Sequence, residues 1–157
     1  MIKVKKVPLP SLGEPLTGFI QGFVDHSKEK ELTVEKVYDL MKNFSTEYPS
    51  GSNAFYWIVE DGKKKGYLYA VVIDDEYFER IVWVQSTFMD GVKGYVWGHI
   101  QNELKALGKS HRCKAMYFDT LRNPKAFARR LRQNWTLDSY SMKHTFEDKD
   151  YAKKSIR

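Results

Sequence analysis

Cysteine and histidine are sparse in this 157-residue chain, which has one cysteine, Cys113, and four histidines. A single cysteine forms no internal disulfide and lacks the partners of a zinc module, so we expect a protein of the reducing cytoplasm. His26, His99, His111 and His144 have no second histidine and no cysteine three or four residues away. The histidine and cysteine spacing that holds a metal on one helix face is therefore missing, and we expect no metal site.

Long hydrophobic runs are also missing. The longest, such as Tyr67–Ile73, falls far short of the roughly 20 residues that a membrane-spanning helix needs. The first residues show no apolar signal segment with a small-residue cleavage site. With 42% hydrophobic and 29% charged residues, the composition is that of a folded globular chain, and its length predicts one domain over residues 1–157. We expect neither a membrane protein nor an exported one.

Basic and aromatic residues are what the chain has in excess, with a net charge of +6 and 15% aromatic residues. The charge is concentrated between Lys105 and Arg132, where nine basic residues face one acid, Asp119. The nine are Lys105, Lys109, Arg112, Lys114, Arg122, Lys125, Arg129, Arg130 and Arg132. Such a segment suits a polyanion, either nucleic acid or a phosphorylated cofactor.

Hydrophobic periodicity predicts four helices. Their ranges are 16–23, 34–44, 95–107 and a stretch that begins at Asn123. Thr33 is a predicted N-cap, Gly108 a predicted C-cap, and Pro124 stands at the first position of the last helix.

Runs of β-branched and aromatic residues predict strands between these helices. The ranges are 2–7, 55–60, 67–74, 80–88, 115–120 and 135–146, with 61–66 as a hairpin loop. Lysines alternate along the first strand, a pattern typical of a sheet edge. Tyr67–Ile73 is apolar on both faces, which predicts a sheet covered by helices on both sides. The order β-α-α-β-β-β-α-β-α-β indicates an α+β fold with a partly parallel sheet.

The segment from Trp83 to Gly98 combines a strand, a loop with Gly91 and Gly94, and the start of a helix. Free backbone N–H groups and the helix dipole make such a junction suited to anions, although the two glycines also serve as ordinary turn residues.

This arrangement resembles the GNAT acyltransferase superfamily, whose cofactor loop reads Arg/Gln-x-x-Gly-x-Gly/Ala and precedes an Asn-x-x-Ala helix and a Gly-Phe turn. Lys93-Gly94-Tyr95-Val96 fits the core of the loop, Asn123-Pro124-Lys125-Ala126 fits the helix motif, and Asn134-Trp135 falls at the turn. The resemblance covers roughly residues 55–146. It implies a mixed sheet of about six to seven strands covered by about four helices.

Three positions depart from that pattern. Gly91 stands at the Arg/Gln position, Val96 at the second Gly/Ala position, and Arg130 where many members carry a general-acid tyrosine. Val96 puts a β-branched side chain where the backbone approaches a pyrophosphate, so we expect a narrowed or shifted loop.

The resemblance implies acetyl-CoA as co-substrate, its pantetheine along Gln85–Thr87 and its pyrophosphate against the amides of Val92–Val96. The implied cofactor-binding residues are Gln85, Ser86, Thr87, Val92, Lys93, Gly94, Tyr95, Val96, Asn123 and Arg130.

The implied reaction is direct acetyl transfer to an amine, which needs an oxyanion donor, a base and a group that protonates the thiolate. A backbone N–H near Ser86 is the expected oxyanion donor. Tyr117, Tyr95 and Glu60 are the catalytic candidates, with solvent as an alternative acid and Asp119 or a water relay as alternative bases.

Three interpretations of the function stay open. The chain is an enzyme acting on a small-molecule or protein amine, or a catalytically silent GNAT-fold module that holds nucleic acid through Lys105–Arg132. The third is an acyltransferase that acts on nucleic acid.

Four aromatic residues either fill the core or form a stacking platform for a base or aromatic amine. They are Trp57, Tyr67, Tyr69 and Trp83.

Overall fold

The computed structural model describes residues 1–27, 31–48, 51–74, 79–119, 135–138 and 141–146. The elements, in chain order, are β1 (Ile2–Val7), α1 (Leu16–His26), α2 (Val34–Glu47), β2 (Asn53–Glu60), β3 (Lys63–Asp74), β4 (Arg80–Met89), α3 (Val96–Ser110), β5 (Ala115–Asp119), β6 (Trp135–Asp138) and β7 (Ser141–Thr145). The strands form one seven-stranded sheet in the order β1-β2-β3-β4-β5-β7-β6. Only β4 and β5 pair in parallel, which confirms the predicted mixed α+β architecture.

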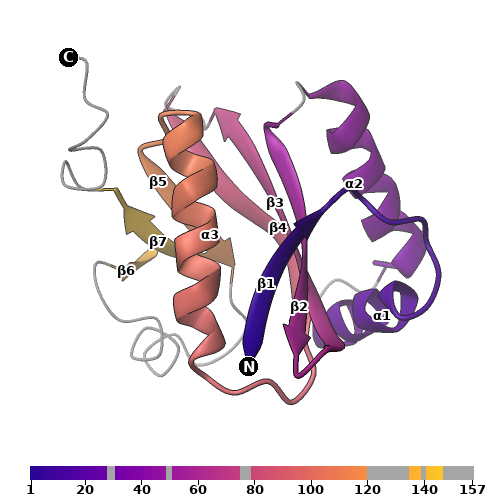
Figure 1. Ribbon diagram of the computed structural model, residues 1–157. Helices are drawn as coiled ribbons and strands as arrows, with labels where there is room; N and C mark the ends of the chain where they lie inside the picture. Colours follow the sequence, from indigo (N-terminus) through magenta and orange to yellow (C-terminus); the bar gives the residue numbers. More distant parts are fainter. Residues whose placement is uncertain (28–30, 49–50, 75–78, 120–134, 139–140, 147–157) are drawn as a thin grey trace.

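Helices cover both faces of this sheet, so the core has two layers (Figure 1). On one face α3 packs through Val96, Ile100 and Leu104. On the other face α1 and α2 pack through residues such as Ile20 and Met41. The central strand β3 has no exposed surface from Tyr67 to Val71, which confirms that both of its faces are covered.

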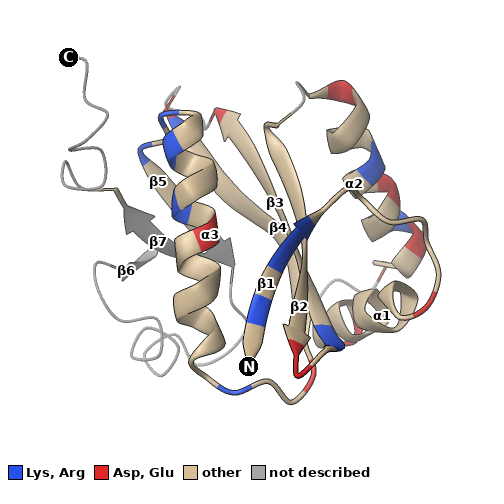
Figure 2. Cartoon of the chain, viewed as in Figure 1, with Lys and Arg blue, Asp and Glu red and all other residues tan. Residues whose placement is uncertain are grey.

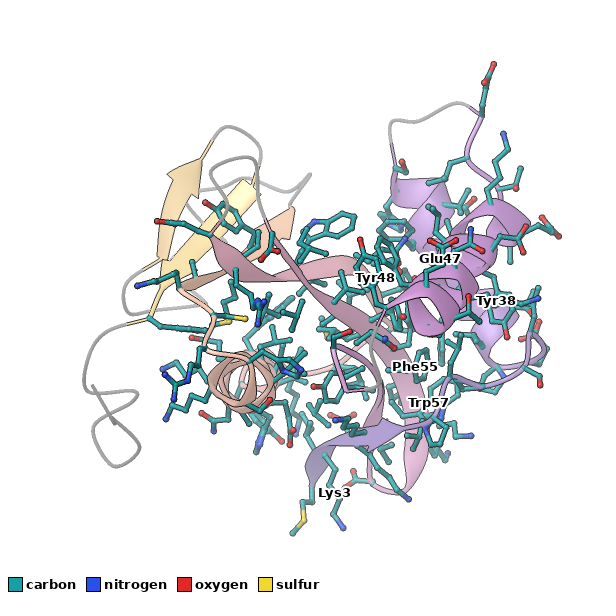
Figure 3. The ribbon with its side chains drawn as sticks, turned by 90° about the horizontal axis from the view of Figure 1, so that it is seen from above. Lys3, Tyr38, Glu47, Tyr48, Phe55 and Trp57 are labelled. Atoms are coloured by element: carbon teal, nitrogen blue, oxygen red, sulfur yellow. The ribbon has the colours of Figure 1, made fainter. Side chains whose placement is uncertain are left out.

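Four aromatic side chains of β2 and β3 belong to the layer under α1 and α2, namely Phe55, Trp57, Tyr67 and Tyr69. Trp57 is 6% exposed, and Tyr67 and Tyr69 have no exposed surface. Phe55 and Trp57 lie on the side of β2 that these helices cover (Figure 3). The stacking-platform interpretation is therefore wrong for Trp57, Tyr67 and Tyr69, because burial under two helices leaves no ring face for a ligand.

The hairpin between β2 and β3 is tighter than the sequence suggested. Asp61 and Gly62 have φ values of 51° and 80°, and β3 begins at Lys63. Positive φ at both central residues is the mark of a two-residue turn that follows the twist of its strands. The predicted loop at 61–66 is thus wrong, since its three lysines already belong to β3.

The C-terminal end of α3 also differs from the prediction, which placed its cap at Gly108. The helix continues to Ser110 and ends in a Schellman motif, in which the Cys113 amide donates to the Gly108 carbonyl at 2.9 Å and the Arg112 amide to the Lys109 carbonyl at 3.3 Å. The left-handed residue is Arg112, with φ of 56°. Gly108 instead allows close packing, because a Cβ there would clash with the Phe146 ring.

The predicted strand at 135–146 is two strands. β6 and β7 pair in antiparallel fashion, with Trp135 opposite His144 and Asp138 opposite Ser141. Asp138 and the serine after it are common turn residues, a signal that the single-strand prediction overlooked. The predicted helix beginning at Asn123 lies outside the described residues. Within those residues, no helix has the length and apolar character needed to cross a membrane.

Candidate functional site

The most unusual feature of the sheet is the separation of β4 from β5. The two strands pair only from Ile81 opposite Ala115 to Val84 opposite Phe118. β4 then runs on to Met89 beside β3, whereas Asp119 of β5 pairs with Ser141 of β7. In the described part of the chain no strand pairs with this edge of β4 beyond Val84. The backbone there is available to an extended ligand.

A β-bulge in β4 lies at the point of separation. Tyr69 is opposite Ser86 and Ala70 is opposite Val84, so Gln85 is an extra residue on β4. A bulge leaves its extra residue outside the hydrogen-bond ladder and re-aims the neighbouring side chains. The Ser86 hydroxyl donates to Gln85 Oε1 at 2.6 Å, and the Thr87 hydroxyl donates to the Tyr67 carbonyl at 2.7 Å.

The loop after β4 leads directly into α3. Its first amide, of Asp90, donates to the Lys65 carbonyl at 2.8 Å, and Gly91 has φ of 66°. A positive φ is adopted freely by glycine, which explains that residue at the turn. An added Cβ on Gly94 would meet no atom within 4 Å, so this part of the loop faces open space.

The amides of the loop just before α3 have no backbone acceptor among the described residues. The amides of Val96, Trp97 and Gly98 donate to carbonyls three residues earlier, at 3.1, 3.3 and 3.1 Å. Among the described residues, the amides of the loop from Val92 to Tyr95 donate to no backbone carbonyl. No side chain caps the helix and no acidic residue stands in its first turn. The positive end of the helix dipole is therefore uncompensated, and it suits an anion.

Val96 does not narrow this loop, contrary to the expectation from its β-branched side chain. It is 1% exposed and packs in the core beside Ile100. The side chain points away from the amides that would approach an anion.

Lys93 supplies the positive charge of the loop. Asp61 binds the N-terminal ammonium of Met1, which lowers the pKa of that carboxyl, and Lys93 lowers it further. The loop after β4, the β2–β3 turn and the first residue thus lie at one end of the sheet.

The three catalytic candidates lie in different places. Tyr117 is half-buried and opposite Trp83, one pair before β4 and β5 separate. Glu60 is opposite Lys63, seven residues along β3 from the Ala70–Val84 pair, or about 20 Å at the rise of a strand. Tyr95 is 55% exposed at the start of α3, where its ring meets that of His99. Only Tyr117 lies beside the point of separation.

Of the predicted cofactor residues, the structure brings Gln85, Ser86 and Thr87 to the unpaired part of β4. It places Val92, Lys93, Gly94 and Tyr95 in the loop that follows. Asn123 and Arg130 lie outside the described residues. Among those described, no group of three or more His, Cys, Asp or Glu is placed to hold a metal ion.

Sequence reasoning missed the Ser86–Gln85 hydrogen bond and the buried hydroxyl of Tyr67. In the described part of the chain, two buried side-chain oxygens form no hydrogen bond of ordinary geometry. They are the Tyr67 hydroxyl and Glu60 Oε2. Burial raises the pKa of Tyr67 above its usual range, and the nearby Ser86 side chain opposes this shift. The available signal was the polar run Gln-Ser-Thr inside an otherwise apolar strand.

Solved structures with this arrangement are GNAT acetyltransferases. A GNAT-family acetyltransferase from Staphylococcus aureus Mu50 matches with a TM-score of 0.64 at 14% identity, over 94% of this chain and 100% of that one. The chain has the GNAT fold. The glucosamine-6-phosphate N-acetyltransferase of Arabidopsis thaliana shares the GNAT fold with it at a TM-score of 0.57 and 13% identity, over 88% of this chain and 95% of that one.

A predicted acetyltransferase from Clostridium acetobutylicum, solved with acetyl-CoA, matches the same GNAT fold with a TM-score of 0.52 and 10% identity, over 74% of this chain and 79% of that one. No protein-family model matches the sequence, and neither does any curated protein. At these identities the shared property is the GNAT fold.

Proposed function

We propose that this protein is an N-acyltransferase that moves an acetyl group from acetyl-CoA to an amine. The observation that carries the proposal is the separation of β4 from β5 at a bulge, followed by a loop of unpaired amides at an uncapped helix. The chain has a single cysteine, the buried Cys113, which agrees with a reducing compartment, so we further propose that the reaction takes place in the cytoplasm.

The residues present fit such a co-substrate. The unpaired edge of β4 from Gln85 to Thr87 offers backbone groups to the amides of pantetheine. The loop amides from Val92 to Tyr95 and the ammonium of Lys93 suit the pyrophosphate. Met89 lies about 16 Å beyond Val84 at the rise of a strand, so the two ends of the site suit an extended molecule with a thioester at one end and phosphates at the other.

Tyr117 is the residue that we assign to proton transfer, because it lies beside the point where β4 and β5 separate. A phenol there delivers a proton to the leaving thiolate. Glu60 lies about 20 Å from this point along the sheet, and Tyr95 lies at the start of α3 rather than on the sheet, so both are weaker candidates. The acceptor in this proposal is an amine of a small molecule or a protein.

Retention on immobilised CoA tests the proposal. We expect the protein to bind and the Gly94→Glu variant to be lost from the resin, because the new carboxylate would stand beside the pyrophosphate. Gly94 has open space around it, so the substitution should leave the fold intact. Gly13→Glu is the matched control, since Gly13 also has open space and lies in another loop. Equal retention of all three proteins, or of none, would refute acetyl-CoA binding at this loop.

Nucleic-acid binding is a second proposal, favoured by where the described basic residues lie. Lys105 and Lys109 are on the C-terminal half of α3, and Arg112 and Lys114 follow it (Figure 2). Lys105 is nine residues, about 14 Å, from the start of the helix. These charges are thus remote from the loop proposed for the CoA pyrophosphate.

Titration with duplex DNA at several salt concentrations tests this second proposal. Binding through several phosphates gives a steep fall of affinity with salt, and the pair of substitutions Lys109→Glu and Lys114→Glu should reduce the slope. A flat response in the unmodified protein would exclude the proposal and leave the acyltransferase proposal unaffected.

A further inference from the structure

A small polar cluster is buried at the β4 bulge, on the face that α1 and α2 cover. Ser86 is 2% exposed and Tyr67 has no exposed surface. Ser86 is opposite Tyr69, a member of the core layer beneath these helices. Polar groups are costly in such surroundings unless they are hydrogen-bonded, so their presence requires an explanation.

The orientation of the Gln85 carboxamide is set by this cluster. Its Oε1 accepts a hydrogen bond of 2.6 Å from the Ser86 hydroxyl. With the oxygen engaged, the amide presents its two N–H donors as its remaining polar groups. Donors suit a carbonyl oxygen or an oxyanion rather than an ammonium group. Gln85 is also the bulged residue at the separation of β4 from β5.

The Tyr67 hydroxyl belongs to the same cluster, beside the Ser86 side chain. It is fully buried, and no hydrogen bond of ordinary geometry reaches it from the described residues. A buried hydroxyl without a well-formed hydrogen bond costs stability. A phenylalanine would avoid this cost, so the hydroxyl has a use other than packing.

We propose that the Gln85 carboxamide donates a hydrogen bond to the carbonyl oxygen of the acetyl thioester, that Ser86 positions the carboxamide directly, and that Tyr67 acts on it through Ser86. This inference rests on the proposed acyltransferase function. In the step, the amine nitrogen forms a bond to the acyl carbon while the carbonyl electron pair moves onto the oxygen that Gln85 faces. The pair then returns, the C–S bond breaks, and CoA leaves as a thiolate that takes its proton from Tyr117. The proton lost by the amine replaces the one that Tyr117 gives up. Gln85 stabilises the oxygen while it carries the charge.

The infrared carbonyl band of bound acetyl-CoA, labelled with ¹³C at the thioester carbon, tests this contact without knowledge of the acceptor. Binding of acetyl-CoA is first measured by calorimetry. We expect the band of the bound thioester to lie at lower wavenumber than that of free acetyl-CoA, and Gln85→Met to remove most of the difference. Gln85→Glu, which keeps the shape and loses the donors, should do the same if the methionine variant fails to fold.

Gln21→Met is the matched control, because Gln21 is exposed on α1 and bonded to Asp25. It should leave the band unchanged. An identical band in Gln85→Met and the unmodified protein, with acetyl-CoA bound to both, would overturn the inference and leave the proposed function standing. Failure of the unmodified protein to bind acetyl-CoA would overturn both.

The positioning role of Tyr67 is tested by comparing rate with stability. Hydroxylamine serves as a small acceptor, since its nitrogen is unprotonated at neutral pH. We expect Gln85→Met to lower kcat by about 100-fold, the usual effect of losing one oxyanion donor, with little change in the KM for acetyl-CoA. Tyr67→Phe should lower kcat about 10-fold and leave the protein as stable or more stable, because it removes an unpartnered polar group. Unchanged kcat in Tyr67→Phe would show that the hydroxyl positions nothing.

Discussion

Cys113 shows how burial controls the chemistry of a single side chain. It is 1% exposed and lies in the core layer under α3. Burial raises the pKa of the Cys113 thiol from 9.0 to about 12, the first cause being desolvation. The neighbouring charge of Arg80 lowers it and that of Asp74 raises it, so these two exposed partners oppose each other. The thiol is an apolar core group rather than a nucleophile.

We predict that Cys113 reacts with an aromatic disulfide reagent about a thousandfold more slowly in the folded protein at pH 8 than in urea, because so little thiolate forms. The native state also holds the proton more tightly than the unfolded state. The protonated Cys113 thiol therefore contributes its full share to the free energy of unfolding below about pH 9, and this share is lost as the pH rises toward 12. Urea unfolding of the wild type and Cys113→Ala across pH 8–11 measures this loss, and fast labelling of the folded protein would contradict it.

Gly66 lies where the backbone of β4 is too close to β3 for a side chain. A Cβ there would lie 2.9 Å from Met89 Cα and would overlap the backbone carbonyl of Phe88. We predict that Gly66→Ala lowers the free energy of unfolding by about 2–3 kcal/mol, because backbone of β4 must move. Gly98→Ala is the control. Gly98 lies in α3 with open space around it, so alanine there should stabilise by about 0.5–1 kcal/mol. Urea midpoints of both variants measure the contrast.

At the scale of elements, α3 ends at a residue under strain. Arg112 holds the left-handed position of the Schellman motif, where glycine is usual. A left-handed backbone costs a non-glycine residue roughly 1–2 kcal/mol. We predict that Arg112→Gly raises the free energy of unfolding by about 1 kcal/mol. Lys109→Gly, inside the helix, should lower it by about as much, and equal changes in the two variants would refute this account of the helix end.

The elements that sequence periodicity predicted well are those whose pattern depends on burial. α2 begins behind Thr33, whose hydroxyl accepts from the Lys36 amide at 3.2 Å as the N-cap prediction requires. β3 is covered on both faces, as its apolar run indicated. β1 lies at the sheet edge, as its alternating lysines indicated.

The features that escaped prediction depend on contacts distant in sequence. Gly108 lies inside α3 rather than at its cap, and it packs against Phe146, from the far end of the described chain. The bulge at Gln85 arises from pairing with β3 and has no local signature. The polar residues Gln85, Ser86 and Thr87 were predicted from the resemblance to the GNAT superfamily, whereas the hydrogen bond that orients Gln85 is seen only in the structure.

At the scale of the whole molecule, the site joins parts that belong to both core layers. The bulge faces α1 and α2, whereas the loop amides belong to the start of α3. A ligand that contacts both holds the sheet and both layers together. Its binding free energy is then coupled to global unfolding rather than to local order.

We predict that acetyl-CoA at 100 times its Kd stabilises the protein by about 2.7 kcal/mol, which raises Tm by about 5–10 °C for a chain of this length. Gly94→Glu should remove the shift and Gly13→Glu should retain it. Differential scanning calorimetry over a range of ligand concentrations measures the effect. A Tm that stays constant at saturating acetyl-CoA would contradict the coupling.

The place of β1 in the sheet sets an order of events in synthesis. Its partner β2 begins at Asn53, so residues 2–7 find their hydrogen-bonding edge only after both α1 and α2 have been made. Loop closure over such a distance is slow and entropically costly. β1 thus leaves the ribosome before β2 and waits for it, and the lysines of β1 keep it solvated and unpaired with other nascent chains during that interval.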